Sequence, residues 1–283
     1  MERIAVLGLG LIGGSLALAL RQADLAAQIA GYDASLDATR RAMERNALTH
    51  ACITAEDAVQ QADMVILATP IRAMPELLMR IAPVLKPGAL VTDTASTKVQ
   101  VVEWARTLLP THVVFVGGHP MAGRESSGID AAEAGLFEGC TYCLTPTAHT
   151  QPDAVTRVRE FVTRLAAHPL LLDAQEHDLL VAGISHLPFV VSSALVRMLG
   201  QDESWSEMAK LAASGYRDIS RLAAGSPAMY RDICSTNKEA IINWLDTLVM
   251  QLAELRSLIA TGDDSLENYF AQAKHVRDGV YNL

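Results

Sequence analysis

The feature that most constrains this chain is a short apolar run followed at once by three glycines in the spacing Gly-x-Gly-x-x-Gly. Residues 4–7 are apolar, Gly8, Gly10 and Gly13 follow, and residues 15–20 then show an apolar helical pattern. In a strand–turn–helix unit the first glycine allows a tight turn, the second lets a pyrophosphate approach the backbone, and the third lets the helix pack close to the strand. This segment predicts a dinucleotide-binding unit. The alternative is a glycine-rich turn that holds no cofactor.

A carboxylate after the next apolar run supports the same prediction. Residues 28–32 end at Asp33, where a carboxylate accepts hydrogen bonds from the ribose of an adenosine. Its charge repels a 2′-phosphate and no arginine follows it directly, so we expect NAD to be preferred, with NADP as the alternative. The N–H groups at the start of the helix face the phosphates. The predicted cofactor-binding residues are Gly8, Gly10, Leu11, Ile12, Gly13, Asp33, Thr69 and Pro70.

Length and composition favour two domains, and the chain is expected to work in the cytoplasm. The chain has 283 residues, 50% of them hydrophobic, which is ample for two cores. We expect no membrane-spanning helix, because no apolar run reaches the required length, and no signal peptide, because a strand begins at Arg3. A net charge of −9 without a cluster of basic residues argues against a nucleic-acid partner. Cys140 and Cys143 form a pair without further ligands, so we expect reduced, buried thiols and no metal site.

Strand and helix patterns alternate through the first part of the chain, which predicts a doubly wound α/β fold of the Rossmann type with a mostly parallel sheet. The expected strands are Arg3–Leu7, Gln28–Asp33, Met64–Ala68, Leu90–Thr94, Val113–Gly117 and a sixth near Tyr142–Leu144. The expected helices are Ile12–Arg21, Ser35–Arg45, Ala55–Gln61, Met74–Ala82, Lys98–Leu108 and Asp153–Leu165. We assign residues 1–170 to this dinucleotide-binding domain.

From about Ala174 the apolar residues recur at helical spacing and clear strand signals are absent. We therefore expect residues 171–283 to form an all-helical domain for substrate binding and dimerisation. The helix expected from Glu239 to Ile259 carries a long apolar stripe that a second subunit would bury. The chain is thus expected to form a homodimer through its C-terminal helices, and the alternative is a compact monomeric bundle.

Four polar motifs fall where a ligand of such a fold binds, outside the carboxyl ends of the strands. Three follow predicted strands, and the fourth lies on the first helix of the second domain. The motifs are Thr69-Pro70, Asp93 to Lys98, Gly117 to Gly123 and Ser185 to Pro188.

His119, in the third of these motifs, is the best candidate for a general base. An imidazole titrates near neutrality, with an ordinary pKa of about 6.5, and the glycines around it leave space for a substrate. His186 is either a second site residue or a partly buried helix histidine. Ser96 is a candidate N-cap for a helix starting at Thr97, and this role is compatible with one in catalysis.

Several motifs occur together in one order, and with them the chain resembles the prephenate and arogenate dehydrogenase family of tyrosine biosynthesis. The similarity runs from Arg3 to about Leu258. The motifs are Gly8 to Ser15, Asp93 to Lys98, Gly117 to Gly123, Leu144 to Thr147, His177-Asp178, Ser185 to Pro188 and Gly215 to Arg221.

The resemblance implies the oxidative decarboxylation of prephenate or arogenate to 4-hydroxyphenylpyruvate or tyrosine, with hydride transfer to a nicotinamide cofactor. It gives His119 the proton of the ring hydroxyl and Ser96 a contact with that hydroxyl. It places Arg221 on a substrate carboxylate, with a guanidinium suited to bidentate binding, and His186 in the substrate pocket. Glu125 is a further candidate for the substrate site: it and Asp218 are candidates for an ion network with Arg221, and the alternative is that either carboxylate is solvated.

Two other functions stay open at this point. A β-hydroxyacid dehydrogenase or imine reductase shares the two-domain plan, but would need a catalytic lysine or other acid where this chain has His177, Asp178 and His186. A non-catalytic dinucleotide sensor would not need so many polar residues at one edge of the sheet. The choice between prephenate and arogenate, inhibition by tyrosine, and the roles of Arg217, Asp218 and Tyr230 also stay open.

Overall fold

The computed structural model describes residues 3–124 and 126–281. The chain divides into two compact units, Met1–Lys238 and Glu239–Leu283. The domain boundary expected after residue 170 concerns function rather than compactness, and it stays a prediction.

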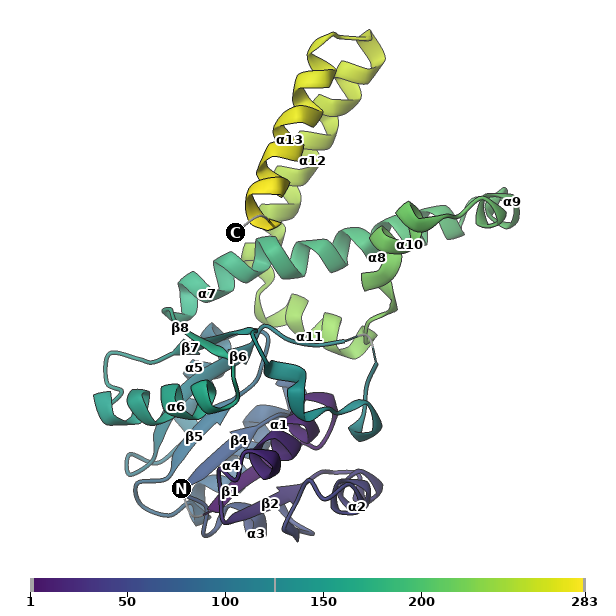
Figure 1. Cartoon of the computed structure of the whole chain (residues 1–283). Coiled ribbons are helices and arrows are strands. Elements are labelled where there is room, and N and C mark those ends of the chain that lie inside the picture. The colour runs from purple at the N-terminus through teal and green to yellow at the C-terminus, as the bar shows by residue number, and fades with distance from the viewer. Residues whose placement is uncertain (1–2, 125, 282–283) are drawn as a thin grey trace. The chain divides into compact units, whose positions relative to one another are not determined.

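The first unit is built on one eight-stranded sheet (Figure 1). Its strands are β1 Arg3–Leu7, β2 Gln28–Tyr32, β3 His50–Ala51, β4 Met64–Leu67, β5 Leu90–Asp93, β6 Val114–Pro120, β7 Thr141–Thr145 and β8 His168–Leu171. They are ordered β3-β2-β1-β4-β5-β6-β7-β8, and all neighbouring pairs are parallel except β6 with β7. The first six strands have the order of a doubly wound dinucleotide-binding sheet, whose ligand crevice lies where the order reverses between β1 and β4. The predicted fold class is confirmed.

Helices cover both faces of this sheet, which explains why its strands are almost wholly apolar. Those of the α/β part are α1 Leu11–Gln22, α2 Leu36–Glu44, α3 Ala55–Val59, α4 Met74–Ile81, α5 Val99–Leu108 and α6 Pro152–Arg164. Leu16 and Leu20 of α1 pack with Ile4 and Val6 of β1 in the core, all four without solvent exposure. The strands β3 and β8 were not predicted. They are short or half-exposed, so they carry no continuous apolar run.

The strand β6 is longer than the sequence predicts, and this changes the setting of His119. We expected the strand to end at Gly117 and the histidine to lie in a loop. Instead β6 continues to Pro120, because residues 117–120 pair antiparallel with β7, with His119 opposite Cys143. A strand holds a side chain more rigidly than a loop does.

Every element described after Leu171 is helical, which confirms the all-helical C-terminal part (Figure 1). The chain forms α7 Ala174–Val181, a π-helical turn Ala182–His186 and α8 Leu187–Gly200 without interruption. The elements that follow are α9 Trp205–Lys210, α10 Ser214–Ser220, the 3₁₀ turn η6 Arg221–Ala224, α11 Pro227–Thr236, α12 Lys238–Thr261 and α13 Ser265–Tyr281. Helix α11 reaches back to the sheet-bearing part and packs on the 3₁₀ turn η1, Ile71–Ala73.

The expectation that no apolar segment is long enough to span a bilayer is wrong. The continuous helix Ala174–Gly200 passes that test by length and composition, with 28% of its apolar window buried. The test is weak evidence, because a core helix of a soluble protein passes it too. The buried face of this helix carries His177, Asp178 and His186, and a carboxylate is costly in lipid.

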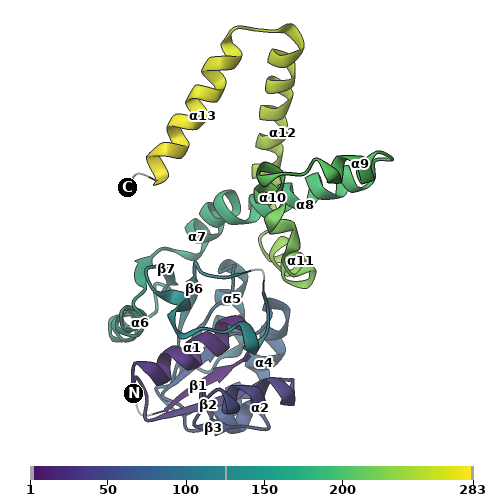
Figure 2. The same ribbon diagram turned by 45° about the vertical axis from the view of Figure 1, so that its right-hand side comes forward.

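The second unit consists of α12 after its first residue, together with α13. The two helices join at one end, have opposite chain directions, and move apart toward their other ends (Figure 2). Their side chains are almost all exposed, including large apolar ones: Trp244, Val249, Met250, Leu252, Ile259, Phe270, Val276 and Val280. Two helices with so much exposed apolar surface have no core of their own.

Replacing Gly13 by alanine is expected to destabilise the first unit. A Cβ atom there would lie 1.8 Å from the carbonyl oxygen of Gly8, which belongs to backbone and cannot swing away. We expect a loss of at least about 1–3 kcal/mol in the free energy of unfolding, measured with urea. Gly10→Ala is the matched control, because nothing lies within 4 Å of its Cβ, and it should cost less than about 1 kcal/mol. Equal stability of the two variants would contradict this close packing.

Candidate active site

The glycine turn between β1 and α1 forms a cradle open to a ligand. Gly8 has φ of +93°, a backbone conformation that favours glycine, and its N–H donates to the carbonyl of Tyr32 over 2.8 Å. Nothing fills the space beside Gly10, and no side chain caps the start of α1. The first N–H groups of that helix, Leu11 and Ile12 among them, are thus available to an anion.

Two polar residues complete the fit to a dinucleotide. The carboxylate of Asp33 accepts the N–H of Leu9 over 2.7 Å and that of Ser35 over 2.8 Å, which holds it beside the glycine turn. A carboxylate has about four acceptor positions, so two are left for ribose hydroxyls. The hydroxyl of Thr69, just after β4, is buried and has no hydrogen-bond partner among the described residues. Pro70 follows it and precedes the 3₁₀ turn η1.

A buried ion pair holds the backbone next to His119. Lys98 and Asp93 are both inaccessible to solvent and are bonded to each other. The ammonium of Lys98 also donates to the carbonyl of Gly118 over 2.6 Å, and Asp93 accepts the N–H of Gly118 over 3.0 Å. The two side chains therefore grip both sides of the residue that precedes His119. Burial lowers the pKa of Lys98, and the charge of Asp93 opposes that shift.

The start of α5 is capped from the helical part rather than by its own segment. The carboxylate of Asp178 accepts the N–H of Lys98 over 2.7 Å and that of Val99 over 2.9 Å. The prediction that Ser96 caps a helix starting at Thr97 is wrong, because the helix begins at Val99 and the acceptor comes from α7. A carboxylate at a helix N-terminus satisfies free N–H groups and complements the helix dipole.

His119, His177 and Asp178 form a chain of buried hydrogen bonds. Nδ1 of His119 lies 2.9 Å from Nε2 of His177, and Nδ1 of His177 lies 2.8 Å from the carboxylate of Asp178. The carboxylate accepts, so Nδ1 of His177 carries the proton and its Nε2 accepts. It follows that Nδ1 of His119 is the donor, and that Nε2 of His119 keeps a lone pair for a substrate proton.

His186 has the opposite tautomer. The side-chain amide of Asn237 donates to the backbone carbonyl of Asp178 over 2.7 Å, which orients the amide, and the same nitrogen lies 3.3 Å from Nδ1 of His186. Nδ1 of His186 therefore accepts and Nε2 carries the proton. That Nε2 is buried and makes no hydrogen bond of ordinary geometry with the described residues, although the backbone of Ser96 lies close enough to oppose the lowering of the His186 pKa.

Burial keeps both imidazoles neutral. It lowers the pKa of His119 well below the ordinary value, and the nearby His177, Lys98 and His186 lower it further. Burial also lowers the pKa of His186 to about 4, although the charge of Asp178 opposes the shift. The sequence suggests an ordinary pKa for His119, and this prediction is wrong because burial in the fold lowers that pKa. One neutral ring presents an acceptor nitrogen and the other presents a donor.

The remaining predicted substrate residues are not brought to this cluster by any described contact. Glu125 lies outside the described residues. Arg221 begins η6 and is exposed, as are Arg217 and Asp218, which approach each other to 3.9 Å. Tyr230 stacks its ring on that of Phe189, with centroids 3.9 Å apart, and its hydroxyl donates to the carbonyl of Leu222.

The cysteines have no part in the site. All four are free thiols, and burial raises the pKa of each. Cys143 is buried as expected, whereas the others are only half-buried. No group of three metal-ligating side chains occurs among residues 3–124 and 126–281.

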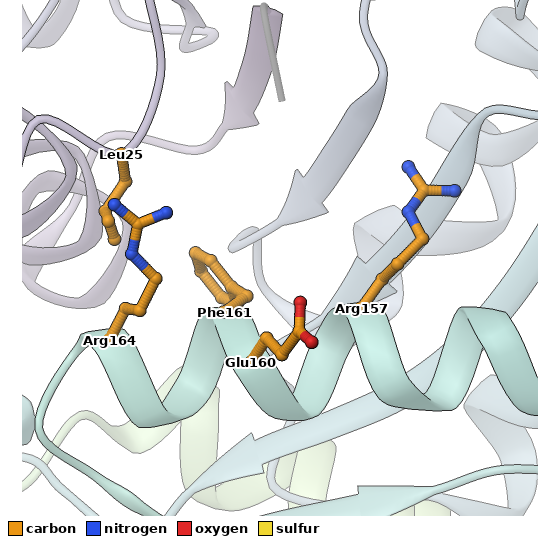
Figure 3. A pocket seen from close by; sticks show the side chains of 5 residues that line it. All are labelled: Leu25, Arg157, Glu160, Phe161 and Arg164. Atoms are coloured by element: carbon orange, nitrogen blue, oxygen red, sulfur yellow. The ribbon is translucent and has the colours of Figure 1, made fainter.

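A cavity of about 240 Å³ lies along α6, apart from these residues (Figure 3). Figure 3 shows Arg157 and Arg164 rising from the helix on either side of Glu160 and Phe161, with Leu25 opposite Arg164. The charges are mixed and none belongs to the motifs above, so this cavity does not contribute to the candidate site.

Sequence reasoning missed the roles of His177, Asp178, Lys98 and Asn237. The first three lie inside recognised motifs, and a lysine and an aspartate directly after a buried strand were a usable signal for a buried pair. Asn237 ends α11 and gave no signal, because only the tertiary fold brings it to Asp178 and His186.

The glycine turn that would bind a dinucleotide and the neutral imidazole base of His119 belong to one doubly wound sheet. This combination defines the class of dinucleotide-dependent oxidoreductases. Two family models match the chain: the prephenate dehydrogenase nucleotide-binding domain over residues 16–171 and the prephenate dehydrogenase dimerization domain over residues 173–272. The chain belongs to the prephenate dehydrogenase family.

Individual relatives agree with this assignment. Prephenate dehydrogenase of Bacillus subtilis (strain 168) is 36% identical to this chain, and the aligned region covers 99% of this chain and 76% of the Bacillus protein. The crystal structure of Synechocystis arogenate dehydrogenase is 34% identical, with a TM-score of 0.84 and 99% and 100% of the two chains covered. Prephenate dehydrogenase from A. aeolicus, in complex with hydroxyphenyl propionate and NAD+, is 29% identical, with a TM-score of 0.92 and 99% and 98% covered.

Removing the charge of Lys98 is expected to cost far more stability than removing an exposed lysine. Lys98→Met leaves Asp93 buried without its partner, which costs about 3–5 kcal/mol. Lys210→Met is the matched control, since its ion pair with Glu207 is about 70% exposed and such pairs contribute about 0–1 kcal/mol. Urea unfolding of both variants measures the difference. If Lys98→Met is no less stable than Lys210→Met, the hydrogen bonds of Lys98 and Asp93 to Gly118 do not stabilise the fold.

Proposed function

We propose that this chain catalyses the oxidative decarboxylation of a cyclohexadienyl substrate, prephenate or arogenate, to 4-hydroxyphenylpyruvate or tyrosine. The observation that carries the proposal is the buried hydrogen-bond chain that leaves the lone pair of His119 Nε2 available on the sheet that also carries the dinucleotide cradle. A ring hydroxyl whose carbon loses hydride needs such an acceptor for its proton. The family assignment and the names of the relatives support the same reaction.

The cofactor proposed is NAD, and its nicotinamide supplies the hydride acceptor. Gly8, Gly10, Leu11, Ile12 and Gly13 would hold the pyrophosphate. Asp33, Thr69 and Pro70 would line the rest of the cofactor site. The carboxylate of Asp33 favours NAD over NADP, because it accepts from ribose hydroxyls and repels a 2′-phosphate.

The site residues divide the remaining work by their chemistry. His119 takes the proton of the ring hydroxyl, and Ser96 orients that hydroxyl. His186 offers a neutral N–H to a substrate oxygen, as its low pKa of about 4 implies. Arg221 binds a substrate carboxylate through its two-pronged guanidinium, and Glu125 is assigned to the same ion network. Aromatisation of the ring drives the reaction, so no metal is assigned.

The subunit arrangement proposed is a homodimer in the cytoplasm, with a small-molecule substrate and neither nucleic acid nor membrane as partner. The exposed apolar residues of α12 and α13 support it, because two isolated helices cannot bury that surface themselves. The family model over residues 173–272 is described as a dimerization domain.

Replacing the proposed base tests the function directly. Steady-state rates of the purified chain with prephenate and arogenate, each with NAD and NADP, should show turnover and a higher kcat/KM with NAD. His119→Asn should lower kcat by about 10²–10⁴, the usual contribution of a positioned acid–base group, and should leave no acid limb in its pH profile. His149→Asn, an exposed loop histidine, is the control and should keep full activity. Turnover near normal in His119→Asn would contradict the mechanism, and no turnover with either substrate would contradict the function.

The oligomeric state follows from the apolar surface of the second unit. Light scattering at micromolar concentration should give twice the 30.4 kDa mass of one chain. Replacing Leu252 and Ile259 by aspartate should shift the mass toward one chain, because charges are costly in an apolar interface. A single-chain mass for the unaltered protein would contradict the proposal.

A further inference from the structure

The buried position of His119 raises a chemical problem that the proposed reaction must solve. A general base works best when its pKa lies near the working pH, yet burial and the neighbouring His177, Lys98 and His186 lower the pKa of His119. Its register partner on the neighbouring strand β7 is Cys143, and because burial raises the pKa of that thiol, Cys143 supplies no negative charge. A proton taken by this ring alone would be held weakly.

His177 has a carboxylate partner that His119 lacks. Its Nδ1 lies 2.8 Å from the carboxylate of Asp178, and no solvent reaches the ring. His119 and His186, both neutral as described above, are titratable groups beside it, and the charge of Lys98 acts on both Asp178 and His119. Helix α7, which carries His177, packs on β7 and α5, so the carboxylate is held in place from both sides (Figure 1).

We propose that His177 and Asp178 store the substrate proton for the length of the reaction, with His119 as the residue that passes it in both directions. This deepens the proposed function and rests on it. His119 Nε2 takes the hydroxyl proton as hydride leaves the ring carbon. His119 Nδ1 gives its own proton to Nε2 of His177, which becomes an imidazolium paired with Asp178.

The overall chemistry has a use for such storage, because the proton lost in the first step is needed again in the last. Loss of hydride and of the hydroxyl proton makes a ring ketone. When the bond to the leaving carboxylate breaks, its electron pair enters the ring and makes a phenolate oxygen, and carbon dioxide departs. The phenolate takes the stored proton back through His119. No proton is released or consumed in total, so a proton held within the site between the two steps serves both of them. His177 and Asp178 act through His119 and are therefore positioning residues rather than catalytic ones.

The test replaces His177 by a residue that keeps the hydrogen bonds but cannot hold a proton. Gln in His177→Gln can accept from His119 Nδ1 and donate to Asp178, so the tautomer of His119 is kept. We expect kcat to fall by about 100-fold, the lower end for a positioned acid–base group, with KM and NAD binding within about twofold. The acid limb of kcat/KM should move to lower pH by about one unit, since the remaining base is the buried His119. His149→Gln is the matched control and should change neither.

A merely structural role for His177 would lower kcat without moving the acid limb, and that result would overturn the proposal. A normal kcat in His177→Gln would overturn it as well. A second measurement needs no variant and no substrate: ¹⁵N NMR of the histidine-labelled protein at alkaline pH should show the proton of His119 on Nδ1. A proton on Nε2 of His119 would falsify the relay even if the enzyme is active. Absence of turnover in the unaltered chain would instead contradict the proposed function and leave the NMR result standing.

Discussion

The carboxylate of Asp178 is where the helical part of the first unit meets the sheet. Its oxygens accept two backbone N–H groups at the start of α5 and the Nδ1 proton of His177, while its own backbone carbonyl accepts from Asn237. A buried carboxylate is tolerated only when it is fully hydrogen-bonded. The start of α5 and His177 of α7 supply the hydrogen bonds that this carboxylate needs. Asn237, at the end of α11, bonds the backbone of the same residue, and His119 of β6 joins through His177, so the candidate site gathers around Asp178.

The same principle orders the charges around His119. Lys98 and Asp93 compensate each other and hydrogen-bond the backbone of Gly118. Asp178 bonds His177 and the backbone of Lys98. Near these charged groups His119 and His186 stay neutral, and their tautomers give the site one acceptor and one donor. Pre-arranged groups of this kind cost little reorganisation during a reaction.

The sequence predicts the sheet part well, because its signals are local. Buried parallel strands are continuous apolar runs, and the glycine turn with Asp33 has a fixed spacing. It predicts less where tertiary pairing decides: β6 is longer because β7 lies beside it, and Ser96 loses its capping role to a residue about eighty positions away in the chain. His119 could be chosen from its motif, but its lowered pKa could not, since burial belongs to the fold. The role of Asn237 and the tautomer of His186 could not be predicted either, because both depend on contacts that only the fold creates.

The long apolar helix from Ala174 to Gly200 shows how one segment serves two demands. One face must carry His177, Asp178 and His186 into a water-poor site, which requires apolar neighbours around each polar group. The other face exposes Leu179, Leu180, Ile184 and Met198, and α12 and α13 expose similar residues. A helix with this many apolar residues has the length and composition of a membrane span even though one face carries buried polar groups. The buried polar positions argue instead for a helix enclosed by protein, with the sheet on one face and, in the proposed homodimer, a second subunit on the other.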